Sequence, residues 1–68
     1  MKEIDARGLS CPEPVMMAKA ALDAGEQELT VLVDNGAAKE NVSRQAKKHG
    51  KDVTVEQNAE GDYILHIK

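Results

Sequence analysis

The chain has 68 residues, a net charge of −3 and a single cysteine. A chain of this length forms one small domain, which buries only roughly 60% of its unfolded surface. The negative charge argues against a general nucleic-acid-binding protein, and one cysteine excludes a disulfide within the chain and fits a reducing compartment.

The first third of the chain predicts a strand followed by a helix. Apolar and charged residues alternate over about residues 2–6, which is typical of a strand. Apolar residues then recur at helical spacing from Pro12 or Glu13 to Ala24, and Gly25 follows as the expected helix terminator. Cys11 therefore lies at a predicted strand-to-helix turn.

The middle of the chain repeats this order. Residues 28–34 predict a second strand, in which Leu29, Val31 and Val33 share one face. Asn35-Gly36 is a turn signal that separates this strand from a second helix over about residues 37–49.

The last third predicts a hairpin with strands over residues 52–56 and 63–67. Its core face is expected to hold Val53, Val55, Tyr63, Leu65 and Ile67. The opposite face of the sheet, toward solvent, is expected to hold Thr30, Leu32, Thr54, Glu56, Ile64 and His66. The pattern βαβαββ predicts an α+β two-layer sandwich with both helices on one face of one sheet, as a single domain over residues 1–68.

Cys11 is the predicted reactive residue. Helix N-termini favour a thiolate over a thiol, and Pro12 and Pro14 fix the geometry of the helix start. Arg7 would support the thiolate and Glu13 would oppose it. From the helix N-terminus we expect a Cys11 pKa below the free value of about 8.5. The position of the second cysteine in a Cys-x-x-Cys motif is taken by Pro14. Sulfur placed on Cys11 can therefore leave only to another molecule, as in a carrier rather than a dithiol oxidoreductase.

Other residues near the cysteine have more than one interpretation. Met16 and Met17 fall away from the apolar stripe of their helix, so they either form a partner surface or fill gaps at the core edge. Asp5 is expected to shape the loop by accepting hydrogen bonds from the backbone or Arg7. The two histidines are scattered, and together with one cysteine they give no metal-ligand spacing, so we expect neither a metal nor a cofactor.

A basic window lies in the second predicted helix and just beyond it, where Glu40 and Arg44 are also spaced to form an ion pair. The first interpretation of this window is a solvated helix face. The second is a docking surface for an acidic partner or RNA. Its cations are Lys39, Arg44, Lys47, Lys48 and Lys51.

Residues 4–17, Ile-Asp-Ala-Arg-Gly-Leu-Ser-Cys-Pro-Glu-Pro-Val-Met-Met, resemble the signature of the TusA/SirA family, an Asp and a Gly-Leu ahead of Cys-Pro-x-Pro. The similarity extends over essentially the whole chain. It implies a mixed four-stranded sheet of order 1-2-4-3, with strand four antiparallel to the rest. In and around this motif, the residues that we expect to shape the loop are Asp5, Arg7, Gly8, Pro12, Glu13 and Pro14.

The resemblance also implies a function. Members accept sulfane sulfur as a persulfide from a cysteine desulfurase or another persulfide donor, and they pass this sulfur to a downstream acceptor protein. By position in the motif, the resemblance places the persulfide on Cys11. Relatives serve tRNA thiolation, molybdenum-cofactor assembly, sulfur oxidation or, in two-domain forms, a selenium-linked role. We accordingly expect a cytoplasmic, monomeric sulfurtransferase without membrane or direct nucleic-acid contact. The alternatives are a regulatory or RNA-binding module and a selenium-linked domain, in which Cys11 carries no sulfur.

Overall fold

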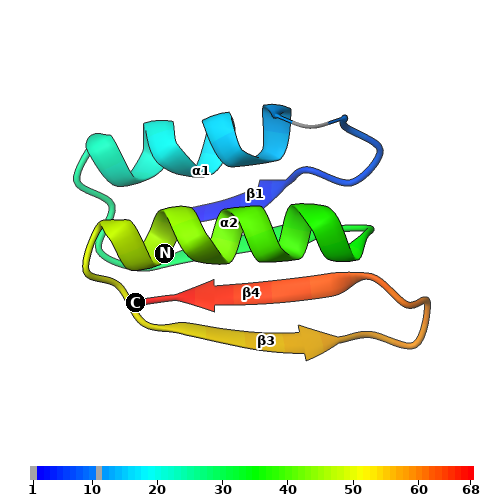
Figure 1. Ribbon diagram of the computed structural model, residues 1–68. Coiled ribbons are helices and arrows are strands. Elements are labelled where there is room, and N and C mark those ends of the chain that lie inside the picture. Colours follow the sequence, from blue (N-terminus) through cyan, green and yellow to red (C-terminus); the bar gives the residue numbers. More distant parts are fainter. Residues whose placement is uncertain (1, 11) are drawn as a thin grey trace.

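The computed structural model describes residues 2–10 and 12–68 (Figure 1). Its elements follow the predicted order βαβαββ. They are β1 (Lys2–Asp5), α1 (Glu13–Asp23), β2 (Leu29–Val33), α2 (Gly36–Lys48), β3 (Val53–Gln57) and β4 (Tyr63–Ile67).

The four strands form one mixed sheet in the order β1-β2-β4-β3, which confirms the predicted topology. β1 runs parallel to β2, whereas β4 is antiparallel to both of its neighbours. Both helices lie on the same face of the sheet and pack against each other (Figure 1). Each helix follows a strand of the parallel pair, so the two helix N-termini lie at the same end of the molecule.

The core is aliphatic and lies between the helices and the sheet. Leu29, Val31 and Val33 of β2 are all buried, as their alternation predicted. Small residues such as Ala18 and Ala46 allow the helices to approach closely, which suits a chain without Phe or Trp. The other members of the buried apolar cluster are Ile4, Ala6, Ala21, Leu22, Ala38, Val42, Leu65 and Ile67.

The helix ends have local causes. Gly25 adopts a φ of +89°, and its N–H donates to the Leu22 carbonyl, so α1 ends in the left-handed turn that favours glycine. At the start of α2, the Asn35 side chain accepts a hydrogen bond of 2.8 Å from the Ala38 N–H. This contact satisfies one of the unpaired donors of the first helical turn.

For two residues the predicted exposure was wrong. Val55 was predicted in the core but is 42% exposed, because β3 is an edge strand that extends beyond the cover of the helices (Figure 1). Thr30 was predicted to face solvent but is buried. It lies on the central strand β2, where Glu3 and His66 are its neighbours on the two sides.

Candidate functional site

The candidate site is the motif loop, residues 6–12, which connects β1 to the start of α1. Cys11 itself lies outside the described residues. Ser10 and Pro12, which flank it in the sequence, are both exposed. The other end of the loop is anchored in the sheet, since the Ala6 N–H donates to the Leu32 carbonyl at 2.8 Å.

The motif loop is hydrogen-bonded at Gly8 to the residue that directly follows β2. The backbone of Gly8 has a φ of +79°, and its N–H donates a 2.7 Å hydrogen bond to Asp34 Oδ2. Asp34 directly follows β2, and its other oxygen accepts from the Asn35 amide. The hydrogen bond from the Gly8 N–H is the main cause that holds the pKa of Asp34 below its ordinary value, and the hydrogen bond from Asn35 is the second. The ionised carboxylate is therefore the form that binds the loop. Sequence reasoning assigned no role to Asp34.

Arg7 joins two carboxylates that are far apart in the sequence. Its Nε and Nη2 each donate to a different oxygen of Asp5 at 2.9 Å, and its Nη1 donates to Asp62 Oδ2 at 3.1 Å. The Arg7 side-chain hydrogen bonds lower the pKa of Asp5 to about 2. Asp62 belongs to the connection between β3 and β4, so Arg7 ties the motif loop to the hairpin.

This geometry changes the expected electrostatic role of Arg7. The sequence suggested that its charge would support a thiolate. The structure instead places two carboxylates on the guanidinium, which balance its charge and occupy its donors. These contacts support the expected role of Arg7 in shaping the motif loop, which stays a prediction.

The start of α1 offers few backbone donors. Pro12 is the N-cap residue, and Pro14 occupies the second helical position and is buried. Of residues 12–14 only Glu13 has an N–H, and this group donates to the Ser10 carbonyl at 2.9 Å. A nearby anion would therefore be favoured mainly by the helix dipole.

Two exposed methionines follow on the same helix. Met16 is 61% exposed and Met17 is 38% exposed, which fits the predicted partner surface without testing it. Met17 also lines an apolar hollow between α1 and the edge strand β1. The other lining residues of this hollow are Lys2, Ile4, Ala20, Ala21, Ala24 and Glu26.

Neither histidine belongs to the motif loop. His49 is the C-cap residue of α2 and contacts Asp23 at the end of α1. His66 lies on β4 and contacts Glu56 at 2.7 Å. Among the described residues no group of three or more His, Cys, Asp or Glu side chains could hold a metal ion.

No helix in residues 2–10 and 12–68 is both long and apolar enough to cross a membrane.

Comparisons with known proteins agree over nearly the whole chain. The family model described as "Sulfurtransferase TusA" matches residues 2–68. Relatives named "Putative sulfur carrier protein" occur in Methanocaldococcus jannaschii and Bacillus subtilis. The archaeal relative is 38% identical over 100% of this chain and 93% of its own length. The bacterial relative, YrkI, is 37% identical over 93% of this chain and 85% of its own length.

A solved structure confirms the fold. The crystal structure of a SirA-like protein from Desulfitobacterium hafniense superposes with a TM-score of 0.91 at 34% sequence identity. The match covers 98% of this chain and 95% of that one. Family model, relatives and fold agree with the Cys-Pro-x-Pro motif and the 1-2-4-3 sheet, and the chain therefore belongs to the TusA/SirA family of sulfur carrier proteins.

Proposed function

We propose that this protein is a persulfide carrier that acts through Cys11. The Cys11 thiolate attacks the outer sulfur of a donor persulfide, so that a new S–S bond forms on Cys11 while the donor S–S bond breaks and the donor leaves as a thiolate. The outer sulfur keeps its proton throughout. An acceptor thiolate then attacks the outer sulfur of the Cys11 persulfide in the same way, and Cys11 returns to a thiolate.

The observation that carries this proposal is that the only cysteine of a sulfur-carrier-family chain stands in the Cys-Pro-x-Pro motif. With no second cysteine in the chain, the loaded sulfur cannot be displaced as an internal disulfide. The surroundings support transfer between proteins, because Ser10, Pro12 and Met16 are exposed on or beside the motif loop. The contacts of Gly8 with Asp34 and of Arg7 with Asp62 hold that loop against the sheet.

The proposed partners are a cysteine desulfurase as donor and a relay protein as acceptor, with delivery to tRNA thiolation or related sulfur trafficking. The activity is that of a sulfurtransferase limited to relay, in the cytoplasm.

Loading is tested by incubating the protein with a cysteine desulfurase and cysteine and measuring its intact mass. We expect an added mass of one sulfur atom that reductant removes and that Cys11→Ser lacks. Sulfur retained by Cys11→Ser contradicts the proposal. So does a wild-type protein that gains no sulfur from the desulfurase and none, in a separate reaction, from inorganic polysulfide. Mixing the loaded protein with candidate relay proteins then shows which of them gains the sulfur.

A further inference from the structure

The cations of the basic window fall into two groups in the structure. Lys39 Nζ lies 3.7 Å from Glu40 Oε1 and 5.0 Å from the centre of the Tyr63 ring, and Lys51 donates to the Gln27 carbonyl at 3.3 Å. These two cations therefore have partners within the domain.

The remaining three cations, Arg44, Lys47 and Lys48, form the α2 basic face. Within the described part of the chain, none of them forms an ion pair. The predicted pair of Glu40 with Arg44 is not formed, because Glu40 lies against Lys39, and Arg44 donates instead to the Asn41 amide oxygen at 3.3 Å.

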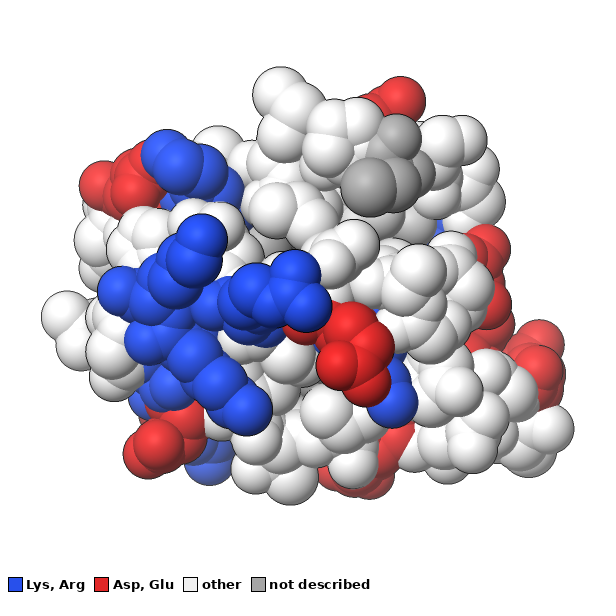
Figure 2. All heavy atoms as spheres, in the orientation of Figure 1, with Lys and Arg blue, Asp and Glu red and all other residues white. Residues whose placement is uncertain are grey.

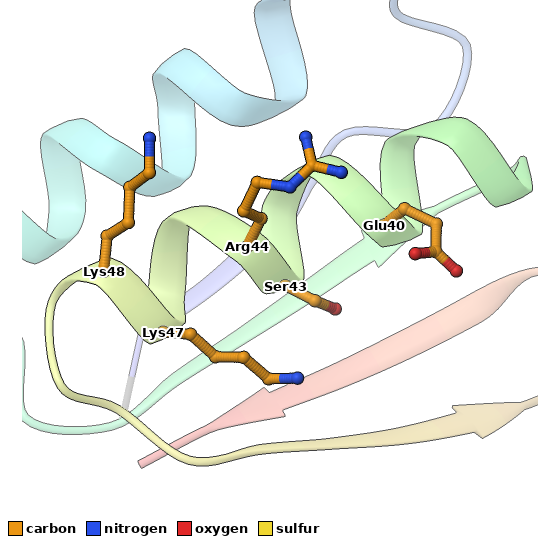
Figure 3. A pocket seen from close by; sticks show the side chains of 5 residues that line it. All are labelled: Glu40, Ser43, Arg44, Lys47 and Lys48. Atoms are coloured by element: carbon orange, nitrogen blue, oxygen red, sulfur yellow. The ribbon is translucent and has the colours of Figure 1, made fainter.

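These side chains gather on the outer surface of the molecule. Figure 2 shows Lys and Arg atoms in one continuous group over the C-terminal half of α2. Arg44 and Lys48 point to the same side of the helix, and Lys47 points to the other (Figure 3). Together with Glu40 and Ser43 they line an open hollow. The chain as a whole is negative, so this group is a local reversal of charge.

The α2 basic face reaches the start of α1. Arg44 and Lys48 also line a second hollow, whose other walls include Pro12 and Val15 of the α1 start. Pro12 directly follows Cys11 in the sequence. A partner that covered Arg44 and Lys48 would therefore contact the motif loop as well.

The chemistry of this face favours a carboxylate-rich protein surface over a nucleic acid. Unpaired cations attract acidic groups and speed encounter, most strongly at low salt. Single-stranded nucleic acids are usually held by cations together with exposed aromatic rings. The chain has one aromatic residue, Tyr63, and it is partly buried with Lys39 over its ring.

We propose that the α2 basic face docks an acidic surface of the protein that loads Cys11, a cysteine desulfurase, and so brings the donor persulfide to the motif loop. This inference rests on the proposed persulfide function and adds the surface and charge of the partner. It requires that Arg44 and Lys48 promote binding of the desulfurase and do not change the reactivity of Cys11 itself.

The test compares two loading reactions in two charge variants. Arg44→Glu/Lys48→Glu reverses the α2 basic face, whereas Lys2→Glu/Lys68→Glu reverses two cations outside it and changes the net charge equally. Each protein is loaded by a desulfurase with cysteine, and separately by inorganic polysulfide. We expect the Arg44/Lys48 variant to load from the desulfurase at least about 10-fold more slowly at low salt, with the difference shrinking toward about 0.5 M salt. Loading of the Arg44/Lys48 variant from polysulfide, a small anion, should slow much less than its loading from the desulfurase. Lys2→Glu/Lys68→Glu should load as the wild type does in both reactions.

The outcomes separate the two proposals. If polysulfide and desulfurase both fail to load wild-type Cys11, the persulfide function itself is wrong. Two outcomes overturn the docking proposal alone, and in both of them polysulfide loads Cys11. In the first, the desulfurase loads the Arg44/Lys48 variant as fast as the wild type. In the second, the desulfurase does not load the wild type at all. Binding of a single-stranded RNA oligonucleotide that the variant loses, with desulfurase loading unaffected, would also overturn it in favour of nucleic acid. Circular dichroism of each variant establishes that it is folded.

Discussion

His49 Nε2 lies 2.9 Å from Asp23 Oδ1, and Nδ1 of the same ring lies 3.1 Å from the Gln45 carbonyl oxygen. Both partners only accept hydrogen bonds, and a neutral imidazole donates from one nitrogen only. The geometry therefore fits the protonated ring, which links the C-terminal ends of α1 and α2.

The first prediction concerns the pH dependence of this contact. Hydrogen bonds to Asp23 and then to the Gln45 carbonyl raise the pKa of His49 above its ordinary 6.5. A group whose pKa is raised on folding stabilises the fold fully below its unfolded pKa, and this contribution is lost as pH rises through the folded pKa. The destabilisation caused by His49→Gln should be largest below pH 6.5 and shrink above it, as measured by urea unfolding at several pH values.

An NMR titration of the His49 ring checks the cause. Its pKa should fall toward 6.5 in Asp23→Asn. Lys19→Gln removes the other partner of Asp23, at 2.7 Å, but keeps the histidine contact, so it should not lower the His49 pKa. A wild-type His49 that titrates at or below 6.5 would contradict this account.

The second prediction concerns the ion pair of Arg7 with Asp5. Hydrogen bonds from Arg7 hold the Asp5 pKa at about 2, so in Arg7→Gln it should rise toward 3.8. A lowered carboxyl pKa contributes stability above the unfolded value, which is lost as pH falls from 3.8 toward about 2. Carbon-13 NMR of the Asp5 carboxyl measures the shift.

Arg7→Lys is the matched control for Arg7→Gln. A lysine keeps the charge but cannot reproduce the forked pair of hydrogen bonds, so an intermediate Asp5 pKa is expected. Equal Asp5 pKa values in wild type and Arg7→Gln would show that the guanidinium does not hold the carboxylate in solution.

The third prediction concerns the hydrogen bond from the Gly8 N–H to Asp34. Asp34→Ala removes the acceptor, so exchange of the Gly8 amide hydrogen should rise toward the rate of an unprotected amide. Asp34→Asn keeps an acceptor oxygen without the charge and should give an intermediate rate. Hydrogen exchange followed by NMR measures both, and protection of Gly8 that is unchanged in Asp34→Ala would rule out Asp34 as the anchor of the motif loop.

The fourth prediction compares two partners in the β3–β4 ladder. Leu65 and Val55 are paired in register, yet Leu65 is fully buried and Val55 is 42% exposed. Leu65→Ala should lower the free energy of unfolding by about 2–5 kcal/mol, whereas Val55→Ala should change it by only about 0.5 kcal/mol. Urea unfolding followed by circular dichroism measures both values.

A domain of this size has little stability to lose, so Leu65→Ala could leave too little folded protein to measure. Ile67→Val is the milder core variant, because Ile67 is also buried, and it should cost about 0.5–1.5 kcal/mol. If Val55→Ala proved as costly as the core variants, β3 would be covered in solution by something beyond this domain.

The sequence by itself determined the order of the elements, the buried face of β2 and the position of the Cys-Pro-x-Pro motif. These features are local. Alternation and helical spacing depend on neighbouring residues, so Leu29, Val31 and Val33 were predicted to share a buried face, and they do. The family motif added the sheet order, which the structure confirms.

The tertiary structure alone decided how completely each face is covered and what holds the motif loop. Alternation tells which side of a sheet a residue faces but not what covers it, so Val55 on an edge strand and Thr30 on a central strand were both misassigned. Asp34 is 26 residues from Gly8, and Asp62 is 55 residues from Arg7. The pairing of the strands brings these carboxylates to the loop. Contacts between segments so far apart leave no periodic pattern in the sequence, so they could not be predicted from it.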